Sequence, residues 1–241
     1  MSERFFLSAA PRDGTAVLAG DEARHLARVL RARVGDMVTL FDGRGRTWQA
    51  RVERIARDTV ELAAGAPVDA PPPAGPRLTL AVALPKGERQ KWLVEKLTEL
   101  GVSGLVPLET ARGVAEATAA ATARLERQVI EACKQCGRDT LMEIAPGRPL
   151  AALLADAAPT GARVVIAHPL AAPLDAAAVQ AGATEVIALV GPEGGFTDDE
   201  LAAAERAGAI RAALGPHILR VETAALALAA RLVPAEPARA R

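Results

Sequence analysis

The sequence has few aromatic residues, few lysines and almost no cysteine. Its 241 residues include four phenylalanines, two tryptophans and no tyrosine, which disfavours a surface that stacks single-stranded bases on aromatic rings. Two cysteines cannot form a disulfide scaffold. No apolar stretch approaches membrane-spanning length, and the first residues lack the apolar block of a signal peptide. These absences predict a cytoplasmic protein without a membrane partner.

An excess of charge of one sign is also missing. The chain carries 29 basic and 29 acidic residues, so no global field attracts it to nucleic acid, and such binding must come from local patches. Cys133 and Cys136 have the spacing of redox and zinc sites, but no second cysteine pair completes a site. We therefore predict no metal. Half of the residues are hydrophobic (50%), enough for one large core or two modest ones.

A proline-rich segment divides the chain. Residues 65–76 contain five prolines and almost no bulky side chain, which is typical of a semi-rigid linker. We therefore predict a first domain at residues 1–66, a linker at 67–76 and a second domain at 77–241.

The first domain has the pattern of a small β-barrel. Apolar or alternating runs predict strands at 38–41, 48–55 and 60–63, and residues 42–45 predict a hairpin turn. One helix is expected at 21–31, with Asp21 as its N-cap.

The second domain alternates between strand and helix patterns. Strands are expected at 78–84, 104–108, 164–167, 186–190 and 212–214, and helices at 88–100, 122–136, 197–207 and 222–233. This alternation predicts an α/β fold with a mostly parallel sheet and helices on both faces.

The segment from Ile187 to Thr197 is the most informative part of the chain. Its apolar strand pattern stops at Gly191, Gly194 and Gly195 leave backbone N–H groups open to a ligand, and Thr197 with Glu200 forms a capping box. A strand, a glycine loop and a helix start in this order predict a ligand cradle at the carboxyl edge of the sheet.

A second glycine loop follows about 23 residues later. Gly215-Pro216 forms a turn after the strand predicted at 212–214, and the chain then leads into an alanine-rich helix. We expect adjacent parallel strands to bring both glycine loops side by side as walls of one pocket. His168-Pro169, after the strand at 164–167, is expected to form a third wall.

A row of arginines marks the predicted helix of the first domain. At 100° per residue, Arg24, Arg28 and Arg31 fall within a sector of about 60°, with Leu26, Val29 and Leu30 opposite. Guanidinium groups suit phosphate contacts, and Arg33 lies just beyond. The alternative is a solvated helix face neutralised by nearby acids. The arginine row alone favours that alternative, whereas its presence in a chain that also carries a ligand cradle favours phosphate contacts.

These residues resemble the SPOUT family of RNA methyltransferases, and within it the ribosomal RNA small subunit methyltransferase E group. The resemblance covers nearly the whole chain and rests on Arg4–Phe6, His25–Leu26, Val29–Arg31, Lys86–Gly87, Lys96, Glu99–Val102, Gln135–Arg138, Gly191–Gly195 and Leu214–Thr223. The chain departs from the pattern at His217, where the family usually has arginine.

The resemblance implies a fold, a cofactor and a reaction. The second domain would carry a deep trefoil knot whose loops hold S-adenosylmethionine, and the first would be a PUA-like barrel that holds RNA. The protein would be a homodimer with its active site near the subunit interface. It would methylate N3 of one uridine in 16S ribosomal RNA, within the small ribosomal subunit.

The implied reaction, together with the patterns described above, assigns roles to residues. The residues expected to hold S-adenosylmethionine are His168, Pro169, Leu170, Leu189, Gly191, Pro192, Glu193, Gly194, Gly195, Leu214, Gly215, Ile218, Leu219 and Thr223. Arg220 is expected to stabilise negative charge on the uracil oxygens, and either Glu193 or Glu222 to accept the N3 proton. The expected RNA contacts are Arg4, Arg24, Arg28, Arg31 and Arg33.

Two other functions remain open. The same pocket would serve a SPOUT methyltransferase that acts on transfer RNA or on another ribosomal site. A non-catalytic RNA-binding or nucleotide-binding protein is the second alternative, although a dinucleotide fold needs a glycine motif after its first strand and residues 84–88 are not one.

Overall fold

The computed structural model describes residues 3–113 and 119–234, and the chain forms two compact units. Of the described residues, the first unit takes 3–72 and 130–141, and the second takes 73–113, 119–129 and 142–234. Pro72 lies within the predicted linker. That residues 130–141 belong with the first unit was not predicted, because no local pattern in them points to a distant strand.

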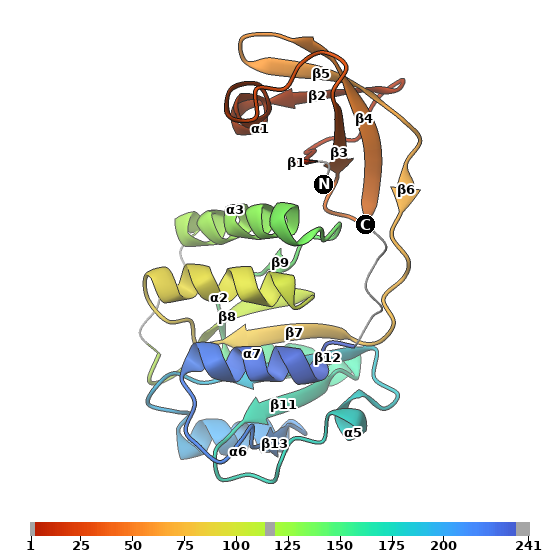
Figure 1. Ribbon diagram of the computed structural model, residues 1–241. Coiled ribbons are helices and arrows are strands. Elements are labelled where there is room, and N and C mark those ends of the chain that lie inside the picture. Colours follow the sequence, from red (N-terminus) through yellow and green to blue (C-terminus); the bar gives the residue numbers. More distant parts are fainter. Residues whose placement is uncertain (1–2, 114–118, 235–241) are drawn as a thin grey trace. The chain divides into compact units, whose positions relative to one another are not determined.

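The first unit is a six-stranded, mostly antiparallel sheet. Its strands are β1 (Arg4–Phe6), β2 (Thr15–Ala19), β3 (Met37–Phe41), β4 (Arg46–Ile55), β5 (Thr59–Ala64) and β6 (Val68–Asp69). They follow the order β1-β3-β4-β5-β2, and β6 pairs with β4 (Figure 1). The expected hairpin at residues 42–45 is confirmed, since β3 and β4 are antiparallel neighbours. The short strand β6 lies inside the segment predicted as linker.

The helix of the first unit differs from the prediction. Helix α1 spans only Gly20–Arg24, and a π-helical turn, His25–Val29, continues it. The N-cap is Ala19, while Asp21 pairs with Arg24 instead.

The π-helical turn also breaks the predicted arginine sector. It rotates each residue by less than an α-helix does, and the helix ends before Arg31, whose φ is +54°. Val29, expected on the buried side, is 70% exposed. The sector prediction was therefore wrong for Arg31 and Val29, although Arg28, Arg31 and Arg33 are all exposed.

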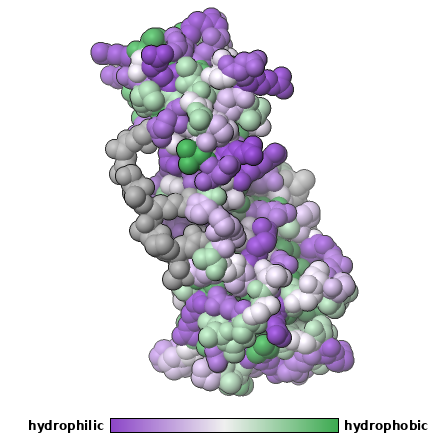
Figure 2. All heavy atoms as spheres, turned by 90° about the vertical axis from the view of Figure 1, so that its right-hand side faces the viewer, coloured by the Kyte–Doolittle hydropathy of each residue, from purple (hydrophilic) through white to green (hydrophobic). Residues whose placement is uncertain are grey.

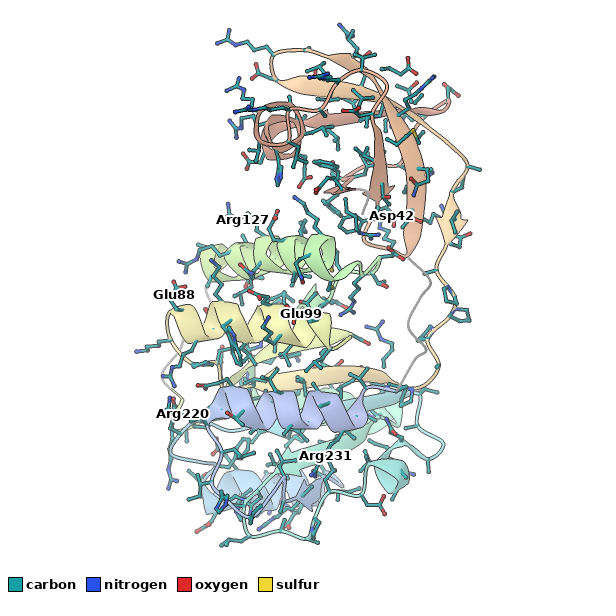
Figure 3. All side chains as sticks on the ribbon, in the orientation of Figure 1. Asp42, Glu88, Glu99, Arg127, Arg220 and Arg231 are labelled. Carbon is teal, nitrogen blue, oxygen red and sulfur yellow. The ribbon has the colours of Figure 1, made fainter. Side chains whose placement is uncertain are left out.

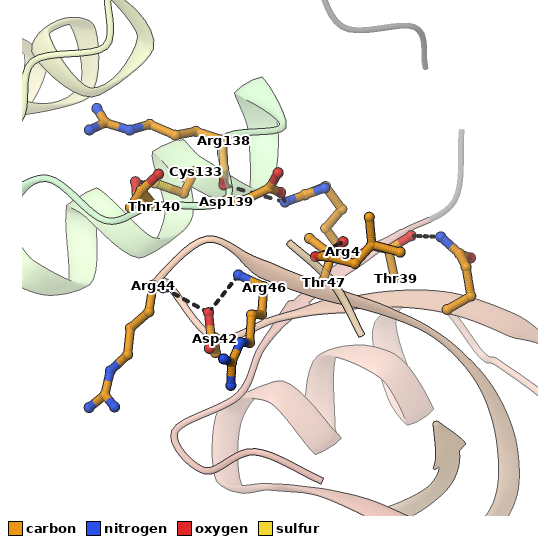
Figure 4. Close-up of polar contacts among 12 residues, drawn as sticks. Arg4, Thr39, Asp42, Arg44, Arg46, Thr47, Cys133, Arg138, Asp139 and Thr140 are labelled. Atoms are coloured by element: carbon orange, nitrogen blue, oxygen red, sulfur yellow. Dashed lines mark hydrogen bonds and ion pairs between the residues drawn. The ribbon is translucent and has the colours of Figure 1, made fainter. Parts of the chain in front are cut away.

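Polar contacts fix the ends of the first unit's strands (Figure 4). Asp42 Oδ1 accepts hydrogen bonds from the backbone N–H groups of Arg44 and Arg46 at 2.8 and 3.0 Å, which closes the hairpin. Arg4, expected to contact RNA, places Nη2 2.5 Å from Asp139 Oδ1, and its guanidinium lies 5.0 Å from the Phe41 ring centroid. Its side chain is only 18% exposed. Arg4 thus holds the segment 130–141 against the sheet.

Cys133 gives the protein a testable pH dependence. Its buried thiol donates to the Thr140 carbonyl oxygen at 3.7 Å, and burial raises its pKa to about 12. Because the unfolded thiol has its pKa near 9.0, the unfolded state binds fewer protons above that pH, and stability falls as the pH rises. We expect Cys133→Ala to remove about 1.4 kcal/mol per pH unit of this fall, measured by urea denaturation above pH 9. If Cys133→Ala lost stability with rising pH as steeply as the wild type does, Cys133 would not be the cause of this fall.

The second unit is a seven-stranded parallel sheet. Its strands are β7 (Arg77–Val82), β8 (Gly104–Glu109), β9 (Glu143–Ile144), β10 (Arg148–Pro149), β11 (Arg163–Ala167), β12 (Glu185–Val190) and β13 (Ile210–Ala212). They follow the order β10-β8-β7-β12-β11-β13, with β9 beside β8 (Figure 1). All strands therefore end at one edge, as the sequence predicted for an α/β fold.

Helices cover both faces of this sheet. They are α2 (Glu88–Glu99), α4 (Leu150–Ala157), α5 (Ala176–Gln180), α6 (Asp198–Arg206) and α7 (Val221–Leu232). A further helix, α3 (Ala119–Cys136), begins in the second unit, and its residues from Ile130 on belong to the first unit. Ile187 and Leu189 of β12 join one apolar cluster with residues of α4 and α6, while α7 packs on β7, β12 and α2. Because side chains alternate along a strand, α7 covers the other face.

The sequence missed the shortest elements. Helix α4 has Pro149 as its N-cap, without a side-chain hydrogen bond, so no start motif marks it. Strands β9 and β10 have two residues each, too few to show alternation. Helix α5 was also missed, and β13 lies two residues before the predicted strand. The trefoil knot stays a prediction of the family resemblance.

The surface carries no membrane-spanning element among the described residues. None of their helices is long and apolar enough to cross a bilayer. On the face shown in Figure 2, residues of high hydropathy occur singly or in small groups between hydrophilic ones.

Candidate active site

Three loops meet the same edge of the second sheet, after β12, β11 and β13. The sequence predicted that the two glycine loops follow adjacent strands, and this was wrong: β11 lies between β12 and β13. The loop that starts at His168 is therefore the central wall. It is tied to the loop after β13 because His168 N donates to Ala212 O at 3.0 Å and Ala213 N to Ala172 O at 2.8 Å.

The glycine loop after β12 has a fixed conformation. Gly195 has φ +68°, which favours glycine, and its N–H donates to Pro192 O at 2.8 Å. A Cβ added at Gly191 would lie 2.9 Å from the buried Phe196 ring. The packed ring therefore requires glycine at position 191.

The predicted capping box is confirmed. Glu200 N donates to Thr197 Oγ1 at 3.2 Å, and Thr197 N donates to Glu200 Oε2 at 2.7 Å. The other carboxylate oxygen of Glu200 accepts from the backbone N–H of Ala111 at 2.8 Å. Glu200 thus joins the glycine loop to the loop that follows β8.

Arg112, which the sequence did not single out, makes a second contact between the same loops. Its Nη1 donates to Gly194 O at 2.6 Å. A Cβ added at Gly194 would lie 3.3 Å from Arg112 Cδ, so this glycine leaves room for the arginine. Nothing local distinguishes Arg112 from the many other arginines of the chain.

The loops after β11 and β13 leave apolar side chains outside the core. Leu170 is 90% and Ile218 is 89% exposed. A Cβ added at Gly215 would meet no atom within 4 Å, so the backbone there is open. Leu189 differs from this group because its side chain is fully buried, which leaves only its backbone for a ligand.

The remaining predicted cofactor residues surround these positions. His168, Leu214 and Leu219 are half-buried, Pro192 is buried, and Pro169, Glu193 and Thr223 are exposed.

Arg220 and the two glutamates lie at the same edge. Arg220 is the N-cap of α7, and its exposed side chain makes no ion pair or side-chain hydrogen bond within residues 3–113 and 119–234. In Figure 3, Glu88 and Arg220 mark this end of α2 and α7, while Glu99 and Arg231 lie toward the other end. The Arg220 guanidinium is thus free to meet a negatively charged substrate group.

The structure distinguishes the two glutamates, which the sequence did not. The Glu193 side chain is 52% exposed, whereas that of Glu222 is 11% exposed. Glu222 Oε2 is buried without a hydrogen-bond partner among the described residues. Both carboxylates face Arg89, whose Nη2 lies 3.5 Å from Glu193 Oε1 and whose Nη1 lies 3.7 Å from Glu222 Oε1. Arg89 is a further residue that the sequence did not single out.

A separate cavity of about 400 Å³ lies beside α4 and α6. It is lined by Glu109, Thr110, Ala111, Pro149, Leu150, Ala151, Asp199, Glu200 and Ala203. None of these is an expected cofactor residue, so this cavity is not the candidate cofactor site. Among the described residues, no three His, Cys, Asp or Glu side chains come together as metal ligands do.

Comparison with known proteins identifies both parts of the chain. Residues 72–233 match the family described as RNA methyltransferase domain, and residues 18–64 match the RNA methyltransferase PUA domain.

Individual relatives agree with these two matches. Ribosomal RNA small subunit methyltransferase E of Mycobacterium tuberculosis is 35% identical, over 92% of this chain and 87% of the relative. The Synechocystis protein of the same name is 30% identical, over 88% and 70%. A solved structure of ribosomal RNA small subunit methyltransferase E from Neisseria gonorrhoeae, bound to S-adenosyl methionine, superposes with a TM-score of 0.86 at 32% identity. It covers 95% of this chain and 96% of that chain.

Proposed function

The chain belongs to the RNA methyltransferase family that includes ribosomal RNA small subunit methyltransferase E, and from that premise we propose its reaction. It transfers a methyl group from S-adenosylmethionine to N3 of one uridine in 16S ribosomal RNA. The observation that carries this proposal is the meeting of three loops, Arg220 and two carboxylates at one edge of the parallel sheet. Ligands of open α/β sheets bind at this edge.

The residues at this edge fit S-adenosylmethionine. The exposed Leu170 and Ile218 offer apolar contacts to an adenine ring, and the open backbone at Gly215 admits a close ligand. The loop at Gly191–Gly195 and the half-buried Leu214 and Leu219 supply backbone groups for the remaining polar atoms. When bound, the cofactor supplies an electrophilic methyl group on a sulfonium.

The chain's own side chains then prepare the nucleophile. Uridine N3 carries a proton at neutral pH, so its removal places negative charge on the uracil ring. Arg220, exposed at the N-cap of α7, stabilises that charge. Glu193 accepts the proton, because its carboxylate is reachable from solvent, whereas the second oxygen of Glu222 is buried. Glu222 holds α7 in place.

The first unit binds the RNA substrate through its exposed arginines. Arg28, Arg31 and Arg33 supply phosphate contacts, and Arg24 contributes beside its pairing with Asp21. Arg4 contributes to RNA binding indirectly, because its pairing with Asp139 holds the segment 130–141 in position. We further propose that the enzyme acts as a homodimer, in the cytoplasm, on 16S RNA within the small ribosomal subunit, as the family resemblance implies.

Replacing both Arg28 and Arg31 with alanine tests the RNA surface. We expect weaker RNA binding and a slope of log affinity against log salt that is smaller by about 0.7 for each phosphate that the variant no longer neutralises. The matched control is Arg54→Ala, since Arg54 is exposed but pairs with Glu61. An unchanged slope in the double variant would rule out these contacts.

Mapping modified uridines by mass spectrometry tests the reaction itself. RNA from a strain that lacks the protein should miss one N3-methyluridine of 16S RNA, and the purified enzyme with S-adenosylmethionine should restore it. Loss of a methyl group in transfer RNA or at another ribosomal site would favour the first alternative. Calorimetric binding of ATP but not S-adenosylmethionine would favour a nucleotide-binding protein.

A further inference from the structure

Arg89 pairs with carboxylates from two of the proposed cofactor walls. Its guanidinium is 3.5 Å from Glu193, in the glycine loop after β12, and 3.7 Å from Glu222, in the first turn of α7. Helix α7 follows the loop after β13, so the two carboxylates come from different walls. Arg89 itself comes from the first turn of α2, after β7, the strand that pairs with β12.

Arg89 is a cationic side chain in the first turn of helix α2, where a positive charge is unfavourable. The first turn of a helix carries partial positive charge, which favours acidic side chains and disfavours basic ones. Helix α2 begins after Gly87, whose φ is +70°, and this places Arg89 within the first turn. Two carboxylates facing the same guanidinium compensate for that position, while Glu222 lies favourably in the first turn of α7.

The buried environment of Glu222 gives this contact its importance. Its side chain is 11% exposed, and Oε2 is buried without a partner among the described residues. A buried carboxylate needs a countercharge, and Arg89 is the cation that faces its other oxygen. Helices α2 and α7 pack against each other (Figures 1 and 3), so the pair also fixes where α7 begins.

We propose that Arg89 is a positioning residue of the active site, which acts through Glu193 and Glu222. By pairing with both, it holds the glycine loop after β12 and the start of α7 at the separation that S-adenosylmethionine requires. This inference rests on the proposed function, because the proposed function identifies S-adenosylmethionine as the ligand that binds between these walls.

A mutant cycle tests whether Arg89 acts through the two carboxylates. In calorimetry, Arg89→Met should raise the dissociation constant for S-adenosylmethionine about tenfold, and the Glu193→Gln, Glu222→Gln double variant should raise it similarly. Adding Arg89→Met to that double variant should then change the constant less than about twofold. Lys91→Met, on the same helix, is the matched control and should bind as the wild type does. An equally large effect of Arg89→Met in both backgrounds would overturn the proposal.

Hydrogen exchange of the protein without cofactor gives a second, independent readout. The backbone amides of Gly191, Glu193, Gly194 and Gly195 should exchange several-fold faster in Arg89→Met than in Lys91→Met, because the loop loses one of its ties. Arg89→Lys, which keeps the charge but not the fork, should restore part of the protection. Unchanged exchange in Arg89→Met would contradict the positioning role. Wild-type protein that binds no S-adenosylmethionine would instead count against the proposed function, so the two failures are distinguishable.

Discussion

Replacing Arg220 with alanine is expected to lower the rate of methyl transfer by about 10²–10³-fold while the affinity for S-adenosylmethionine changes only about threefold. The guanidinium stands exposed at the N-cap of α7 and makes no ion pair among the described residues, so its removal leaves no buried partner behind. Its stabilising effect applies only when the uracil ring carries negative charge. Single-turnover rates and calorimetry measure the two quantities separately.

Arg231→Ala is the matched control for Arg220→Ala. Arg231 is exposed in the last turn of the same helix, away from the proposed site (Figure 3). Its replacement removes the same charge from the same helix and should leave turnover near the wild-type rate. Near-wild-type turnover in Arg220→Ala would refute its assigned role.

Replacing Glu193 with glutamine is expected to have the other large effect on turnover. General-base catalysis contributes about 10²–10⁴-fold, so turnover should fall within that range while cofactor binding stays within about threefold. Glutamine keeps the shape of the side chain, but it cannot accept the N3 proton. Single-turnover rates at saturating cofactor measure the chemical step.

Glu222→Gln provides the comparison for that result. Glu222 is buried and faces Arg89, so its replacement should weaken cofactor binding and lower turnover by less than about tenfold. The opposite outcome, with turnover lost in Glu222→Gln and kept in Glu193→Gln, would exchange the two roles.

Much of the fold followed from local sequence signals. The strand at Glu185–Val190 is a continuous apolar run, the helix at Asp198–Arg206 has a capping box, and Gly137, with φ +84°, ends α3. These signals depend on residues within one or two turns of each other. The helix at residues 21–31 was wrong because a π-helical turn rotates its side chains, and no composition marks such a turn.

The candidate site was predicted less completely than the fold. Its glycine loops and Arg220 follow strands and precede helices, so their place at the sheet edge could be inferred. Arg89 and Arg112 could not, since each acts on a loop about 80 to 130 residues away in sequence. Long arginine side chains on exposed positions look alike until their partners are known.

The amino-acid sequence alone determined the α/β class, the helix and strand positions that carry strong periodicity, and the family to which the chain belongs. Tertiary structure decided that β11 separates the two glycine-loop strands, that residues 130–141 join the first unit, and that Arg89 faces both glutamates. The physical reason is the distance along the chain over which each interaction acts. Periodicity, caps and turns act between neighbours in sequence, whereas strand order and ion pairs depend on the packing of segments that are distant along the chain.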